Sequence, residues 1–435
     1  MDWSSVFSQK TMSAAQAVAT HTQNGDKVFV GGLTSATDTI QALLNAAKSG
    51  ERKGLTLHGN MLLGNIDLAD PAFSEEVLRY RSFFWGGTER AGFKAGSVSF
   101  VPLHFNNYGR YMAQLQPDVA VVPMTPPDEK GYCNLGPMGF NPAGTHNAKK
   151  LIAQITPGLP RVRGSAHDFH VSQIAAFVLG NVPAATIPSG EPSEEDKKIA
   201  SYIVDMIPDG ACFQLGIGGL ANAVGFGLRS KKHLGVHSEM YTESMAALQA
   251  EGIIDNSRKT FMPGISVAGF ALGTQEQYDY LADNPKVYFT PYEYVNDVQN
   301  IAANDNMISV NNALSIDLTG QVCAESIGFR QYSGSGGQVD YIRGATRSNG
   351  GKSFIAVSSV AKTKEGPASR IVLSLAPGSA VTSLRAEVQY IVTEYGCVNL
   401  QYCDIPTRVK RLISIAHPDF RDALTFEAKK AGYLY

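Results

Sequence analysis

The 435-residue sequence is poor in charge, poor in cysteine and free of long apolar runs. Charged residues make up 17% of it and the formal net charge is -2, so it lacks the basic face on which nucleic-acid-binding proteins depend. No window approaches the ~20 apolar residues of a membrane-spanning helix, and the N-terminus has no basic stretch followed by an apolar one. We therefore expect a cytoplasmic protein that binds neither nucleic acid nor membrane.

The cysteines and histidines give no pattern typical of a metal site. His167 and His170 form one short spacing without a third ligand in sequence reach, so no metal is predicted. The five cysteines follow no Cys-x-x-Cys pattern and fit no disulfide framework, and reduced thiols are expected. They are Cys133, Cys212, Cys323, Cys397 and Cys403.

Two common enzyme signatures are also missing. No Gly-x-Ser-x-Gly segment is present, which gives no support to a serine nucleophile in that setting. The run Gly216–Gly219 lacks the third glycine that marks a dinucleotide site, so NAD is not expected. Because this run ends an apolar strand and opens a helix, its amides can still hold an anion or a carbonyl oxygen.

The sequence does contain a weak internal repeat. Gly25–Leu33 and Gly210–Leu220 both read as a strand, a glycine turn and the start of a helix. Downstream, Leu55–Met61 aligns with Leu234–Met240 residue for residue. The order of the segments is the same in both halves, so we interpret them as two copies of one α/β arrangement.

A third pair of segments, Asp128–Cys133 and Asp317–Val322, forms a turn after an apolar run in each half. Strands that alternate with helical patterns predict an α/β fold of two similar domains, each with a mainly parallel sheet covered by helices. Proline, glycine and serine between Val182 and Glu194 mark the boundary. We predict domains over 1–185 and 194–435, with the active site in the cleft between them.

One position distinguishes the copies: Asn60 in the first half corresponds to Glu239 in the second. An amide in one copy and a carboxylate in the other is expected if only one half kept a nucleophile or a base. A solvated glutamate at a strand end remains the alternative for Glu239 taken by itself. A second glycine cluster, Ser333–Asp340, is either a close approach of backbone to a ligand or a flexible turn.

Five segments, read in order, carry a resemblance to a known family: Gly216–Gly219, His237–Met240, Gly336–Asp340, Val392–Gly396 and Ile415–Arg421. Together they resemble the acetyl-CoA hydrolase/transferase family of family I CoA-transferases, and closely its 4-hydroxybutyrate and butyrate CoA-transferases. The resemblance covers essentially the whole chain and is densest after Gly210.

The resemblance implies an enzyme that moves CoA from a short-chain acyl-CoA, of the acetyl-, butyryl- or 4-hydroxybutyryl-CoA type, to a carboxylic acid by a ping-pong mechanism. Glu239 would form an acyl-glutamyl anhydride and then a glutamyl-CoA thioester, with Asn296 and the Gly337 amide stabilising oxyanions. The resemblance further implies acyl-CoA and a small carboxylic acid as partners and a homo-oligomer. CoA, a substrate, would contact Gly216, Ile217, Gly218, Gly219, Leu220, Leu314 and Gly337.

Because the unperturbed pKa of glutamate is about 4.3, Glu239 is expected to be ionised at neutral pH without an activating base. The first domain would shape the acyl pocket, with Met61 and Phe105 as an apolar wall. Glu394 is a second polar candidate, for which a structural role is favoured. The sequence leaves open an acyl-CoA hydrolase using the same glutamate, a transferase for a dicarboxylic acid, and a catalytically silent CoA-binding protein.

Overall fold

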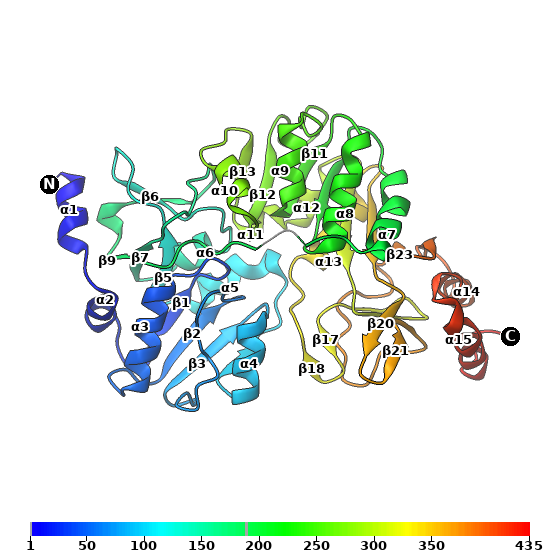
Figure 1. Cartoon of the computed structure of the whole chain (residues 1–435), viewed down its shortest axis with the longest axis horizontal. Helices are drawn as coiled ribbons and strands as arrows, with labels where there is room; N and C mark the ends of the chain where they lie inside the picture. The colour runs from blue at the N-terminus through cyan, green and yellow to red at the C-terminus, as the bar shows by residue number, and fades with distance from the viewer. Residues whose placement is uncertain (1, 188–189) are drawn as a thin grey trace. The chain divides into compact units, whose positions relative to one another are not determined.

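The structure is a computed structural model that describes residues 2–187 and 190–435. The chain divides into two compact units, Met1–Pro188 with Val267–Val295, and Ser189–Ser266 with Asn296–Tyr435. Each unit has a mainly parallel sheet flanked by helices (Figure 1), which confirms the predicted α/β fold class. Unlike the predicted domains 1–185 and 194–435, the units are not continuous in sequence.

The first unit is built on a seven-stranded sheet in the order β4-β3-β2-β1-β5-β7-β9. The seven strands of this sheet are β1 (Lys27–Val30), β2 (Leu55–Gly59), β3 (Leu78–Ser82), β4 (Val98–Phe100), β5 (Val119–Met124), β7 (Lys150–Ile155) and β9 (Ala176–Leu179). Outside this sheet, β6 (Tyr132–Asn134) and β8 (Asp168–His170) form an antiparallel pair, and the later segment contributes β12 (Ser266–Ala271) and β13 (Val287–Phe289). Its helices are α1 (Trp3–Lys10), α2 (Ala14–His21), α3 (Thr37–Lys48), α4 (Gly87–Ala95), α5 (Tyr108–Leu115), α6 (Asn141–His146), α10 (Gln275–Leu281) and α11 (Tyr292–Val295).

Alternation along β1 decides which helix covers which face of this sheet. Val28 and Val30 belong to the core cluster that includes Ile40 of α3. Phe29 points the other way, because a Cβ on Gly144 of α6 would lie 2.3 Å from its ring. Successive side chains of a strand point to opposite faces, so an apolar run such as β1 is buried on both sides. Each such side chain contributes roughly 1.5–3 kcal/mol by leaving water.

The later segment joins this unit through backbone pairing. Met138 forms an isolated β-bridge with Phe270, and Gly164 forms another with Phe289. A Cβ on Gly139 would lie 2.3 Å from the carbonyl oxygen of Gly269, so glycine permits this close approach. Because this pairing joins residues far apart in sequence, the composition of a linker segment cannot predict that residues 267–295 belong to the first unit.

In the second unit the strands follow the order β11-β10-β14-β19-β23-β24, with β24 antiparallel to its neighbour. Its strands are β10 (Cys212–Leu215), β11 (Gly235–Tyr241), β14 (Met307–Asn312), β15 (Ser315–Asp317), β16 (Val322–Cys323), β17 (Ser326–Ile327), β18 (Arg330–Gln331), β19 (Lys352–Ala356), β20 (Val360–Thr363), β21 (Gly366–Ser369), β22 (Ile371–Val372), β23 (Tyr390–Thr393) and β24 (Gly396–Asn399). Its helices are α7 (Glu194–Asp205), α8 (Gly219–Gly227), α9 (Glu243–Ala250), α12 (Val298–Ala302), α13 (Gln338–Arg347), α14 (Ile405–Ile415) and α15 (Pro418–Lys430).

Strand register confirms the internal repeat. In the first unit Val28 of β1 pairs with Leu57 of β2, and in the second Phe213 of β10 pairs with Val236 of β11. These are equivalent positions in the alignment of the two halves. Both pairs of strands are parallel, and β5 and β14 flank β1 and β10 on the other side.

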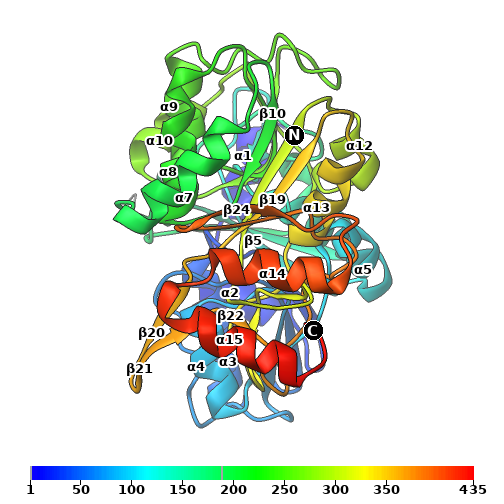
Figure 2. The ribbon, with the colours of Figure 1, turned by 90° about the vertical axis from the view of Figure 1, so that its right-hand side faces the viewer.

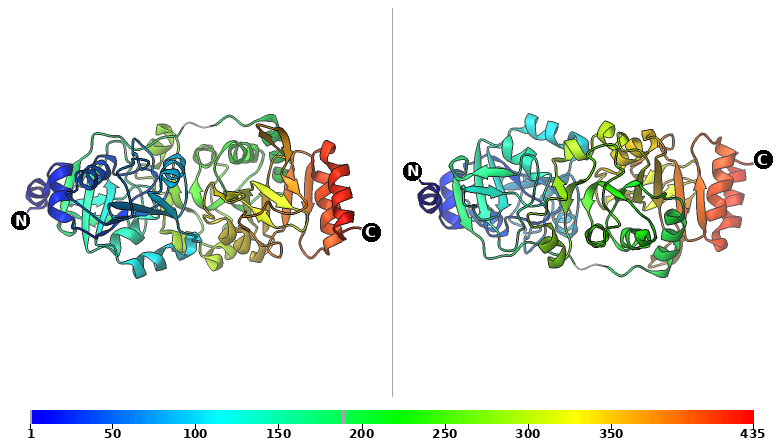
Figure 3. Two further views of the ribbon diagram at one scale, coloured as in Figure 1. Left: turned by 90° about the horizontal axis from the view of Figure 1, so that it is seen from below. Right: turned by 90° about the horizontal axis from the view of Figure 1, so that it is seen from above.

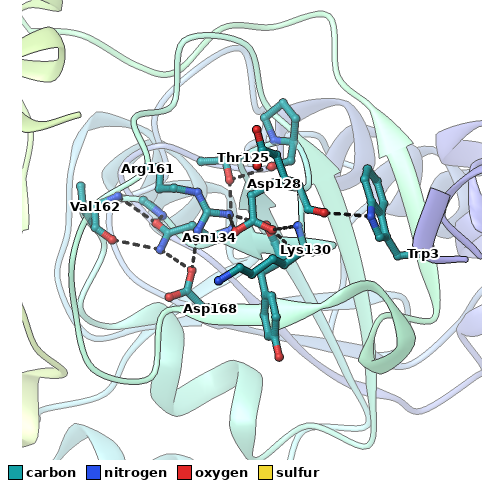
Figure 4. A network of polar contacts seen from close by, with 12 residues as sticks. Trp3, Thr125, Asp128, Lys130, Asn134, Arg161, Val162 and Asp168 are labelled. Atoms are coloured by element: carbon teal, nitrogen blue, oxygen red, sulfur yellow. Dashed lines mark hydrogen bonds and ion pairs between the residues drawn. The ribbon is translucent and has the colours of Figure 1, made fainter. Parts of the chain in front are cut away.

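The third pair of repeated segments adopts the same turn in both units. Asp128 accepts the backbone N–H groups two and four residues on, from Lys130 and Tyr132 (Figure 4), and Asp317 accepts those of Thr319 and Gln321. The residue three positions on is a glycine in each case, with φ of 81° and 97°, values that disfavour a side chain. An Asp followed three residues later by Gly is the sequence signal of this turn.

Two helices end the second unit. Asp404 caps α14 by accepting the N–H of Thr407, and α15 packs against α14. Figure 2 and Figure 3 show the two helices side by side. Among the residues that the structure describes, no helix is both long and apolar enough to cross a membrane.

Candidate active site

Glu239 lies near the carboxyl end of β11, in the second unit, and its carboxylate has two hydrogen-bond donors. The side-chain Nδ2 of Asn296 donates to Oε2 over 2.6 Å, and the backbone N–H of Gly337 donates to the same carboxylate. Asn296 is fully buried. The structure thus brings together the three residues for which the resemblance implies a catalytic role.

Helix packing brings the two donors together. Asn296 precedes Asp297, whose side chain caps α12, and Gly337 is the N-cap residue of α13. The two helices pack closely, since a Cβ on Gly344 of α13 would lie 2.3 Å from the side chain of Ile301 of α12. The N-terminal end of α13, where the helix dipole favours negative charge, therefore lies at the carboxylate.

Gly337 leaves no room for a side chain at this position. A Cβ there would lie 2.0 Å from Oε2 of Glu239 and 2.1 Å from Nδ2 of Asn296. Its φ of -96° is open to any residue, so glycine is required by contact and not by backbone conformation. The second glycine cluster is therefore a close approach of backbone to a carboxylate at Gly337, and the interpretation as a mere flexible turn is wrong there.

Burial changes the protonation of Glu239. Desolvation raises the pKa of Glu239 to about 7, against the hydrogen bonds from Asn296 and Gly337, which lower it. The expectation of a carboxylate fully ionised at neutral pH is corrected, because near pH 7 both forms are populated. A carboxylate in such surroundings, with donors already aimed at it, can act as a base or as a nucleophile for acyl transfer.

The glycine turn Gly216–Gly219 follows the strand that is next to the strand of Glu239. It follows β10, the neighbour of β11, and Gly218 has φ 101° and ψ -175°, a conformation open almost only to glycine. Ile217 is 48% exposed, whereas the side chain of Leu220 is buried, so Leu220 can offer only its backbone to a ligand. The turn opens α8, whose N-terminus suits an anion.

Leu314 follows β14, the neighbour of β10 on the other side. Its backbone N–H donates to the carbonyl of Cys323, and the residue is half-buried. In parallel strands the carboxyl ends share one edge of the sheet, so Glu239, the glycine turn and Leu314 lie along the same edge.

The residues expected to form an apolar wall lie in the first unit. Phe105 is buried, and its ring stacks on Tyr292 with centroids 4.7 Å apart. Met61 follows β2 with a φ of 36°, an unusual value for a residue with a side chain. Asn60, the counterpart of Glu239, is buried. Phe105 is therefore part of a packed aromatic cluster in this unit.

Two further polar residues of the second unit lie close together: Glu394, which the sequence analysis named, and Arg370, which it did not. Glu394 is almost fully buried after β23 and accepts both the backbone N–H and the hydroxyl of Ser359. Arg370, between β21 and β22, was not singled out from the sequence. Its only signal there is a lone cation between short apolar and small-residue segments.

Comparison with known proteins finds two matching family domains, whose bounds differ from those of the two structural units. The N-terminal domain of the acetyl-CoA hydrolase/transferase family matches residues 1–207, and the C-terminal domain of that family matches residues 273–428. The succinyl-CoA:cyclohexane-1-carboxylate CoA transferase of Geobacter metallireducens is 38% identical, covering 98% of this chain and 96% of its own. The 4-hydroxybutyrate coenzyme A transferase of Clostridium kluyveri is 36% identical, covering 99% and 100%.

Among solved structures, that of RipA from Yersinia pestis superposes with a TM-score of 0.94 at 34% identity and covers all of both chains. Identity at this level over the full length confirms the expected resemblance and the expectation of an enzyme. The chain belongs to the acetyl-CoA hydrolase/transferase family.

Proposed function

We propose that the chain is a CoA-transferase that moves CoA from a short-chain acyl-CoA to a carboxylic acid, with Glu239 as the nucleophile. The observation that carries this proposal is the buried carboxylate of Glu239, held by Asn296 and Gly337 at the carboxyl edge of a parallel sheet. The names of the relatives, which are CoA transferases, support the choice of reaction.

In the first step a carboxylate oxygen of Glu239 attacks the thioester carbonyl. A carbon–oxygen bond forms and the carbon–sulfur bond breaks. CoA departs as the thiolate, and an acyl-glutamyl anhydride remains on the enzyme. The thiolate then attacks the glutamyl carbonyl and releases the free acid, which gives a glutamyl-CoA thioester. The two steps then run in reverse with the acceptor acid: its carboxylate attacks the glutamyl thioester and expels the CoA thiolate, and the thiolate attacks the acyl carbonyl of the new anhydride. The new acyl-CoA is released and Glu239 is free again, so the kinetics are ping-pong.

Asn296 and Gly337 fit the second step. Attack on the glutamyl carbonyl places negative charge on an oxygen of the Glu239 side chain, where Nδ2 of Asn296 and the N–H of Gly337 already donate. Donors that need no rearrangement are worth about 3 kcal/mol each in such reactions. The amides of the turn from Gly216 to Leu220, together with Leu314, would hold CoA along the same sheet edge.

The pH dependence of turnover follows from the raised pKa of Glu239. Only the ionised form attacks, so kcat/KM for the acyl-CoA is expected to fall below about pH 7 with a slope of one proton. Asn296→Ala removes a donor that lowers this pKa, so the midpoint is expected to move to higher pH and the rate to drop by roughly 10²–10³-fold. The exposed variant Asn45→Ala is the control. An unchanged midpoint in Asn296→Ala would contradict this assignment.

The choice between transferase and hydrolase is tested by omitting the acceptor. With acetyl-, butyryl- or 4-hydroxybutyryl-CoA alone, a transferase is expected to consume at most one thioester per site, and turnover should begin only when a carboxylic acid is added. Sustained release of CoA without an acid would instead assign a hydrolase using the same glutamate. A panel of mono- and dicarboxylic acids identifies the acceptor class. The homo-oligomer and the cytoplasmic location stay predictions.

A further inference from the structure

Arg370, in the second unit, carries a guanidinium whose Nε atom is not satisfied by the residues that the structure describes. Its Nε atom is buried and has no hydrogen-bond partner, and its side chain makes no ion pair among the described residues. The rest of the residue is half-buried. A guanidinium offers five donors in a fixed fork, and leaving it unpaired away from water costs free energy. Such a donor needs an explanation, and binding of an anionic ligand is one.

Two features define the surroundings of Arg370: its own backbone hydrogen bonds, and the carboxylate of Glu394, which already accepts hydrogen bonds from another residue. Its backbone N–H donates to the carbonyl of Ser359 over 2.9 Å. Ser359 in turn donates both its N–H and its hydroxyl to Glu394, so Glu394 is held in place without forming an ion pair with the arginine. Burial lowers the pKa of Arg370, whereas the nearby Glu394 and Tyr332 oppose that change. The backbone of Arg370 is thus held in place, while Nε of its guanidinium has no partner among the described residues.

Arg370 also lies beside the sheet edge proposed to hold CoA. Its carbonyl accepts the N–H of Ile316, two residues after Leu314. Ser359 and Glu394 follow β19 and β23, and the strand order β11-β10-β14-β19-β23 separates these strands from that of Glu239 by three and four steps. At strand spacing these steps amount to roughly 14 and 19 Å. A substrate that reaches from Glu239 toward Arg370 must be extended, as CoA is.

We infer that Arg370 is a substrate-binding residue that takes an anionic oxygen, either a phosphate oxygen of CoA or the carboxylate of the acid. The inference rests on the proposed function and names one more residue of the same site. Guanidinium pairs with phosphate and carboxylate in a bidentate manner, with stronger hydrogen bonds than neutral donors form. The position beside Leu314 favours a phosphate of CoA as the anion. The experiment below distinguishes this phosphate from the carboxylate of the acid.

The experiment compares Arg370→Gln and Arg370→Lys with the wild type by calorimetric titration with CoA, dephospho-CoA and pantetheine. Arg370→Gln is expected to weaken CoA binding roughly 10- to 100-fold, with partial rescue in Arg370→Lys, which keeps the charge but not the fork. Loss for CoA alone assigns the 3′-phosphate, and equal loss for CoA and dephospho-CoA assigns the diphosphate. If CoA binding is unchanged and the KM for the acid rises by a similar factor, the guanidinium is assigned to the carboxylate of the acid.

A structural role predicts a different set of results. Because the guanidinium has no hydrogen-bond or ion-pair partner among the described residues, Arg370→Gln is expected to leave the unfolding temperature unchanged or to raise it. The control Arg229→Gln removes a guanidinium already paired with Glu251 and should leave all affinities unchanged. Unaltered binding of every CoA probe together with an unaltered KM for the acid would overturn the inference. Wild-type protein that does not bind CoA at all would instead contradict the proposed function.

Discussion

Glutamine in place of Glu239 is expected to abolish CoA transfer, by at least about 10⁴-fold in kcat, a loss of the size seen when a covalent nucleophile is removed. The amide is nearly the same size and can still accept a hydrogen bond from Asn296, which now donates to Oε2. It cannot form the anhydride or the glutamyl thioester. Steady-state transfer assays at pH 8 measure the loss. Glu251→Gln, at a surface pair with Arg229, serves as the matched control and should turn over normally.

The same variant is expected to be more stable than the wild type at high pH. The pKa of Glu239 is about 7 in the folded protein against a reference of 4.5, a difference worth roughly 3 kcal/mol. Well below pH 4.5 the carboxyl is protonated in both states and carries no penalty, whereas above pH 7 the folded protein holds it ionised in a desolvated site. Glu239→Gln should therefore unfold at a higher temperature than the wild type at pH 8, and the difference should shrink as the pH falls through 7 toward 4.5.

Normal transfer by Glu239→Gln would rule out the covalent mechanism. Lost transfer combined with a lower unfolding temperature at pH 8 would point to a structural carboxylate.

Gly337→Ala is expected to lower transfer more than about 10²-fold while the fold persists. The new methyl group would lie 2.0 Å from Oε2 of Glu239 and 2.1 Å from Nδ2 of Asn296, so the carboxylate or its donor must move. Loss of one oxyanion donor costs about 10²–10³ in kcat. The backbone of Gly337 already has a φ of -96°, and replacing glycine by alanine at an N-cap costs on the order of 1 kcal/mol, which is small against the stability of a folded domain. Transfer assays together with thermal unfolding measure the two effects separately.

Gly87→Ala is the matched control for this change. Gly87 begins α4, and a Cβ there would meet no atom within 4 Å. Both variants add one methyl group at the start of a helix, and only one adds it beside the carboxylate. Equal activity of Gly337→Ala and Gly87→Ala would contradict the placement of Gly337 at the reacting group.

The two-fold arrangement could be predicted from sequence because it depends on local signals. Turn chemistry set by an Asp and a Gly three residues on is the same at Asp128 and Asp317, and the structure gives both turns the same hydrogen bonds. Apolar strands with glycine turns fixed the register of β1 with β2 and of β10 with β11. Comparing the copies then singled out Glu239, since Asn60 occupies the equivalent place.

Tertiary effects limited the rest. The protonation of Glu239 depends on desolvation by residues distant in sequence, so its unperturbed pKa was a poor guide. Asn296 came from the resemblance alone, because nothing in its neighbourhood shows that α12 packs against α13 at Gly344. Arg370 was missed for a similar reason, as an unpaired guanidinium is visible only when every possible partner has been placed.

The most direct test of the account is the intact mass of the protein after incubation with short-chain acyl-CoAs, with and without borohydride, followed by peptide mapping. We expect a mass increase of one CoA per site, located on the peptide that contains Glu239. Borohydride is expected to remove this adduct by reducing the glutamyl thioester to an alcohol, and the adduct should be absent from Glu239→Gln. Turnover of the same thioesters with no adduct at any time, or with an adduct on another residue, would contradict the central claim.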